Sequence, residues 1–184
     1  MSNIKSQVSI KGVIRSFRLA KWVKKESKWV KLLRQFIKTK DEAILAFLIE
    51  KGAVLGFTEK NNIIVTVGRA ALAERLAGGT TYTGEINYGA LGTGVAPSPQ
   101  NSSTQLGTEA FRKVAASQAF DDNIAYVDFF YDADDCNGTY TEFANFIDGS
   151  ASANSGQMFS FIATGGWTKS AAESLFVSCQ YTIS

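Results

Sequence analysis

The most constraining feature of the sequence is a series of short strand-like segments at regular spacing in its second half. Each segment is rich in β-branched and aromatic residues, and clusters of glycine, asparagine and aspartate separate it from the next. Such spacing is typical of antiparallel sandwiches and open barrels. We expect strands at residues 85–91, 110–120, 124–132, 139–147, 158–163 and 174–183.

The N-terminal part has a different pattern, in which apolar residues recur at helical spacing and lysines and arginines fill the other face. Ile10, Val13, Ile14 and Phe17 begin this pattern, which predicts one or two amphipathic helices over about 9–38. The phase is imperfect near residues 20–25, where a kink or break is expected. The apolar residues that continue the pattern are Trp22, Trp29, Val30, Leu33, Phe36 and Ile37.

Shorter elements are expected between these two parts. Thr39 and Glu42 have the spacing of a capping box, and they precede a helix at 41–51 that is apolar nearly all round and therefore predicted to be buried. Short strands are expected at 53–58 and 63–65, and a short helix at 66–77.

These patterns predict an α+β fold, with basic N-terminal helices followed by a mainly antiparallel β-sandwich of jelly-roll or immunoglobulin-like type. A chain of 184 residues suits one domain of ordinary size, or one domain with an extension. We expect residues 1–58 to form a basic helical anchoring region and residues 59–184 to form the β-sandwich domain.

Charge divides the chain at nearly the same place. Residues 1–40 carry twelve lysines and arginines and one acidic residue, a net charge of +11, whereas the remaining residues have a net charge of −9. We interpret the cationic arm as a docking element whose aromatic residues pack on a neighbouring subunit and whose charges meet an acidic surface. The predicted docking residues are Trp22, Lys24, Lys25, Lys28, Trp29, Lys31, Arg34 and Phe36.

Two other interpretations of the arm remain open: a helix that contacts nucleic acid or a membrane surface, and a helix that only packs within the chain. The acidic partner surface could belong to the chain's own β-domain or to an adjacent copy. If the arm is only a docking element, deleting residues 1–38 should leave a folded β-domain.

The chain contains no histidine, which excludes histidine-based catalytic triads and most zinc sites. Cys136 and Cys179 have no motif spacing, so we expect free thiols rather than a disulfide. The acidic residues at 132–137 resemble a calcium loop only superficially, because Phe143 stands where the bidentate glutamate is needed. We therefore predict no enzyme activity, no cofactor and no metal site, and we interpret the acidic segment as a hairpin turn.

The apolar run at 43–49 is too short to span a membrane, so no membrane span is expected.

A loop that contains both prolines of the chain follows the strand that ends at Leu91. Its flanks, Tyr88-Gly-Ala-Leu-Gly-Thr-Gly94 and Leu106-Gly-Thr-Glu109, together with Asn137-Gly-Thr-Tyr-Thr-Glu142, resemble in order and spacing a family of tailed-bacteriophage virion proteins. The resemblance covers about residues 60–184. The residues of this family-motif loop that we single out are Gly92, Gly94, Pro97, Leu106, Gly107, Glu109 and Arg112.

The resemblance implies a structural component of the tail, baseplate, neck or head appendage of a phage particle, made in the bacterial cytoplasm and located in the virion. Its expected partners are other virion proteins and further copies of itself, as a trimer or a ring. One alternative is a host-surface or glycan-binding adhesin, although the 93–105 loop lacks the exposed aromatic residues that sugar sites favour. A second alternative is a DNA-contacting virion protein.

Overall fold

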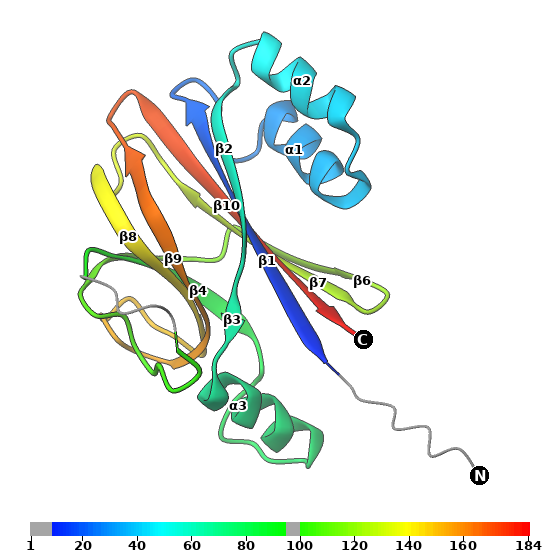
Figure 1. Cartoon of the computed structure of the whole chain (residues 1–184), viewed down its shortest axis with the longest axis vertical. Helices are drawn as coiled ribbons and strands as arrows, with labels where there is room; N and C mark the ends of the chain where they lie inside the picture. Colours follow the sequence, from blue (N-terminus) through cyan, green and yellow to red (C-terminus); the bar gives the residue numbers. More distant parts are fainter. Residues whose placement is uncertain (1–8, 95–99) are drawn as a thin grey trace.

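The computed structural model describes residues 9–94 and 100–184, which form two five-stranded antiparallel sheets that pack face to face (Figure 1). In sheet A the spatial order is β2 (Val54–Asn61), β1 (Ile10–Ala20), β10 (Glu173–Ile183), β7 (Ile124–Tyr131) and β6 (Ser117–Asp121). In sheet B the order is β3 (Ile63–Ile64), β9 (Gln157–Lys169), β8 (Gly138–Ile147), β4 (Ile86–Gly92) and β5 (Glu109–Val114). The predicted α+β class and sandwich architecture are therefore confirmed, whereas the jelly-roll or immunoglobulin-like type stays a prediction.

The strands expected in the second half of the sequence are present with ends shifted by about one residue, except that the strand predicted at 158–163 continues to Lys169 as β9. The segment predicted as one strand at 110–120 forms two, because the chain leaves sheet B after β5 and enters sheet A at β6. The chain makes a similar crossing at Asn62, between β2 in sheet A and β3 in sheet B.

The prediction of a helix over residues 9–38 is wrong for its first part, because residues 10–20 form the strand β1. Both faces of this strand are buried: Ile14 packs in the core between the sheets, while Phe17 and Leu19 pack under the helices. A strand that is apolar on both faces shows no strict alternation, so its residues also fit a helical period.

β1 lies inside sheet A, paired along its whole length with β10 on one side and with β2 on the other. The domain boundary predicted at residues 58 and 59 consequently falls within β2. Phe17 and Val30 from the N-terminal side of that boundary share one buried cluster with Phe130 and Phe176 from the other.

Two helices, α1 (Lys28–Thr39) and α2 (Glu42–Glu50), cover the outer face of sheet A (Figure 1). Their inward residues, including Leu33 and Leu48, are fully buried against that face. The prediction that α2 is buried all round is wrong, because Phe47 and Ile49 are 41% and 52% exposed. Its N-cap is Asp41, whose carboxylate accepts from the Ala43 amide, rather than Thr39.

The third helix, α3 (Thr66–Leu76), lies at the end of the molecule opposite α1 and α2 and packs against β9 (Figure 1). Gly68 permits this close approach, since a Cβ there would lie 2.7 Å from the Phe159 Cα atom. The core between the sheets is largely aromatic and includes Phe129, Tyr131, Phe143 and Trp167.

Deletion of residues 1–38 should abolish cooperative folding, in contrast to the expectation from the sequence. The deletion removes β1 from within sheet A and exposes the apolar face that α1 covers, which is far more burial than a domain of this size can lose. Thermal unfolding followed by circular dichroism checks this. A cooperative transition in the truncated protein would show that the arm and the sandwich are separable.

Candidate functional site

The strongest candidate for a functional surface is an aromatic cluster formed by Trp22, Trp29 and Phe47. Trp22 lies in the segment between β1 and α1, Trp29 is in the first turn of α1, and Phe47 is in α2. The Trp22 and Trp29 ring centroids are 5.3 Å apart and edge-on, and the Trp29 and Phe47 centroids are 6.1 Å apart and stacked. Trp22 is half exposed, so the cluster presents large apolar rings to the surroundings.

Lysines surround the aromatic cluster. Lys28 Nζ lies 4.8 Å from the centroid of the Trp29 ring, and Lys51 Nζ lies 5.6 Å from that of Phe47. Such cation–π contacts hold the ammonium groups over the faces of these rings. Lys21, Lys24 and Lys25 flank Trp22 in sequence and are exposed. The result is an apolar surface with a cationic rim.

Of the predicted docking residues, the structure therefore exposes Trp22, Lys24, Lys25, Lys28 and Lys31 and half-buries Trp29. Phe36 is misassigned, because it is only 2% exposed and packs edge-on against Phe17 and Phe57.

Arg34 is also not free for docking. Its Nε donates to Asp128 Oδ2 on β7 at 2.8 Å. Asp128 is 4% exposed, and burial raises the pKa of its carboxyl group against the opposing effect of the Arg34 guanidinium.

Much of the cationic charge of the arm is neutralised within the chain. Five of the eleven described basic residues among positions 9–40 form ion pairs with acidic residues that follow position 58. Arg15 and Lys40 share Glu59, at 2.5 and 3.2 Å. The acidic surface that was predicted to meet the arm is thus supplied in large part by the sandwich itself.

Replacing Arg34 by methionine should destabilise the protein by about 2 kcal/mol at pH 7, because Asp128 would keep a buried charge without its partner. The folded-state pKa of Asp128, which burial already raises, would rise further in this variant. The folded variant would therefore bind a proton at Asp128 as the pH falls, and the loss of stability should be smaller at pH 5 than at pH 7. Urea unfolding at the two pH values measures this.

The matched control is Lys31→Met, at an exposed position on the same helix. It should change the free energy of unfolding by less than about 0.5 kcal/mol at either pH. An Arg34→Met loss that is equal at both pH values would show that the Asp128 charge is not its cause.

The family-motif loop is held at its base by Glu142 of β8, a residue that the sequence analysis did not single out as functional. Its carboxylate is 1% exposed and accepts from the Gly107 amide at 3.1 Å and the Thr108 amide at 3.4 Å. A Cβ at Gly92 or Gly94 would lie 2.6 Å from Glu142 Oε2. The glycines therefore leave room for a carboxylate that joins the two ends of the loop.

Two further motif residues form a buried clamp on a neighbouring turn. Arg112 Nε and Nη2 donate to the two Glu109 oxygens at 2.6 and 2.7 Å, and both side chains are less than 5% exposed. Arg112 Nη1 also donates to the Ser150 and Ser155 carbonyl oxygens, both at 3.0 Å. Glu109 and Arg112 thus hold the 150–155 turn in place.

Leu106 is buried in the outer core of sheet B. Pro97 lies outside the described residues.

Replacing Glu142 by alanine should cost about 2 kcal/mol of stability, because the Gly107 and Thr108 amides would lose the buried, charged carboxylate that accepts from them. Glu142→Gln, which keeps one acceptor oxygen, should lose less than half as much. Urea unfolding measures both, with the exposed Glu50→Ala as the control. Equal losses for glutamine and alanine would show that the charge, and not the acceptor, stabilises the loop.

Two lysines from elsewhere in the chain, Lys113 and Lys169, bind the oxygen atoms of the acidic segment at 132–137. Lys169 Nζ donates to the carbonyl oxygens of Ala133 and Asp135 at 3.0 and 2.6 Å and to Asn137 Oδ1 at 2.9 Å. Lys113 pairs with Asp132 at 3.0 Å and with Asp135. The ammonium groups take the oxygen atoms that a bound cation would need.

Both cysteines are free thiols, and burial raises the pKa of each to about 12. Within the described ranges, no cluster of acidic or cysteine side chains is arranged to hold a metal ion, and no helix has the length and apolarity to cross a bilayer.

No protein-family model, curated protein or solved structure matches this chain.

Proposed function

We propose that the protein is a structural component of a tailed-phage virion, at the tail, baseplate, neck or head surface, and that it docks onto another virion protein through the aromatic cluster and its lysine rim. The proposal rests on the motif resemblance over residues 60–184. It is supported by one structural observation: three aromatic rings at the surface of α1 and α2, surrounded by exposed lysines.

The chemistry of this surface specifies the partner. Large aromatic side chains that bury on contact contribute most of the binding energy in stable interfaces, and charged rims set orientation. The lysine rim favours an acidic partner surface with an apolar centre. Further copies of the chain in a trimer or ring would present the same surface repeatedly and increase avidity.

Contact with DNA is less well supported by the same geometry. Arg15 and Arg34 would be suited to phosphates, but each is engaged with a carboxylate of the sandwich. Among positions 9–40, most exposed lysines without an ion pair flank Trp22 or lie on α1, whereas Lys11 lies apart from them at the start of β1. A DNA-contacting role would require binding that falls steeply with salt.

The test is incorporation into particles. The double variant Trp22→Ser with Phe47→Ser should fold normally but be at least tenfold depleted from particles of the phage that encodes the chain, purified on a density gradient and quantified by mass spectrometry. The unaltered protein should be present at stoichiometric amounts and be labelled on the particle by immunogold electron microscopy.

The matched control is Phe120→Ser, which also removes an exposed aromatic ring, 83% exposed, but on the hairpin between β6 and β7. It should incorporate like the unaltered protein. Absence of the unaltered chain from purified particles would exclude a virion role, and full incorporation of the double variant would exclude docking through the aromatic cluster.

A further inference from the structure

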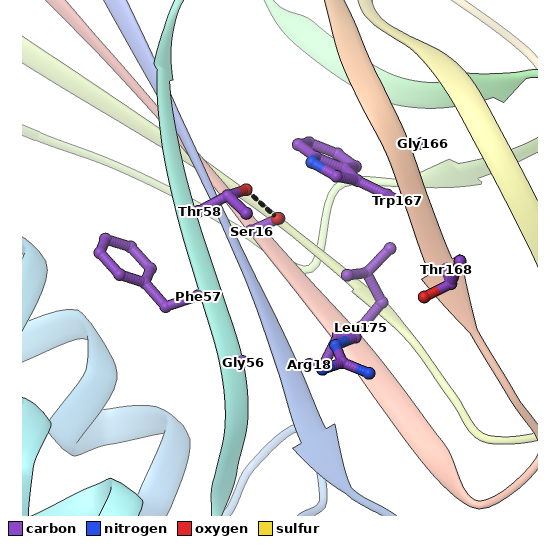
Figure 2. Close-up of a pocket in the computed structure, with 9 residues that line it drawn as sticks. All are labelled: Ser16, Arg18, Gly56, Phe57, Thr58, Gly166, Trp167, Thr168 and Leu175. Carbon is purple, nitrogen blue, oxygen red and sulfur yellow. Dashed lines mark hydrogen bonds between the residues drawn. The ribbon is translucent and has the colours of Figure 1, made fainter.

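A cavity of about 230 Å³ lies between the two sheets, where the edge of β2 faces β9 (Figure 2). The residues around it that matter for its chemistry are Ser16, Arg18, Thr58, Trp167, Thr168 and Leu175. The cavity lies beside the part of β9 that the short strand β3 does not reach, since the two strands pair only at Ser160 and Phe161. The sheets are therefore not joined at this edge, and the space between them is open to one side.

A bulge in β9 places Trp167 at this cavity. Gly165 and Gly166 have φ values of +79° and +94°, and the pairing with β8 shifts register at this level. Thr164 Oγ1 donates to the Tyr140 carbonyl oxygen at 2.5 Å and accepts from the Gly166 and Trp167 amides at 3.1 and 3.3 Å. Bulges of this kind redirect side chains and recur next to binding sites.

The polar groups around the cavity are three hydroxyls, which can donate or accept, and the donors of Arg18 and Trp167. The Ser16 and Thr58 hydroxyls contact each other at 2.7 Å, and Figure 2 shows the Trp167 indole extending toward them from β9. The Trp167 Nε1–H is buried without an acceptor among the described residues, an arrangement that costs free energy. Leu175 supplies an apolar surface between these groups.

Arg18 supplies the charge of the cavity. Its Nη1 donates to Glu173 at 3.1 Å, and the side chain is 41% exposed, so part of its five-donor guanidinium is available to a ligand. The Arg18 guanidinium lies over Gly56. A Cβ atom at position 56 would come within 2.9 Å of the guanidinium, so glycine at this position leaves room for Arg18.

We infer that this cavity binds a small hydroxylated carboxylate of about monosaccharide size, of the hexuronic acid class. The ligand carboxylate would pair with Arg18, its hydroxyls would meet Ser16, Thr58 and Thr168, and one ring face would pack on Leu175 and Trp167. The volume is below that of pockets for drug-sized ligands, which suits a single sugar ring. This site is separate from the aromatic cluster and does not depend on the proposed docking role.

The experiment uses the indole N–H signals of the ¹⁵N-labelled full chain, which has three tryptophans. Trp22→Phe and Trp29→Phe identify the Trp167 signal by elimination. Titration with D-glucuronate should move that signal saturably at millimolar concentration and leave the other two in place. D-glucose and acetate, which each lack one of the two required features, should bind at least tenfold more weakly.

Arg18→Gln should weaken glucuronate binding at least tenfold, whereas Arg75→Gln on α3 should not change it. Should Arg18→Gln fail to fold, Thr168→Ala, at an exposed position, provides the second variant and should weaken binding about threefold. The inference is wrong if the Trp167 signal does not saturate, if glucose or acetate binds as well as glucuronate, or if the folded variants bind like the unaltered protein. Those results would mean that the cavity holds solvent.

Discussion

The pairing of β1 with β10 is the interaction on which the rest of the structure depends. It joins Ile10 to Ile183 and Ala20 to Glu173 in unbroken antiparallel register, so the two ends of the described chain lie side by side inside sheet A. Their inner faces contribute Ile14, Leu175, Val177, Cys179 and Tyr181 to the core between the sheets, and their outer faces form part of the surface on which α1 and α2 pack. Because this pairing spans nearly the whole sequence, it closes late and makes every layer depend on it.

The position of β1 also explains the charge distribution. A strand that carries Arg15 and Arg18 into sheet A must bring counter-charges with it, since a buried cation without a partner is costly. Glu59 on the neighbouring β2 and Glu173 on the neighbouring β10 supply them, and Asp128 on β7 does the same for Arg34 of α1. The opposite net charges of the two halves are thus explained in part by ion pairs within the fold. The described basic residues of the arm that form no ion pair are Lys11 and the lysines at positions 21, 24, 25, 28 and 31.

Local patterns predicted most of the sandwich but not its N-terminal strand. The segments between residues 85 and 183 carry turn residues at both ends, and these signals are sufficient without knowledge of the fold. β1 has no such alternation, since Ile14 and Phe17 are buried on opposite faces, and only its distant partner distinguishes it from a helix. Only part of the residues predicted for docking are exposed, because exposure depends on packing: Phe36 and Trp22 are both aromatic residues of the same basic segment, but Phe36 is buried and Trp22 is half exposed.

The motif glycines could be grouped from the sequence, but the physical reason for their positions could not be predicted from it. Gly92, Gly94 and Gly107 were recognised as a group from their spacing, but their physical reason is Glu142, which lies 35 residues beyond Gly107 and contacts all three. A carboxylate buried at a loop base needs backbone amides that approach it closely, and only glycine lets several strands of backbone do so at once. The loop is therefore defined at its base by the sandwich, and sequence can vary between the two ends without altering the strands. A chain built in this way can carry different surface loops on one fixed scaffold.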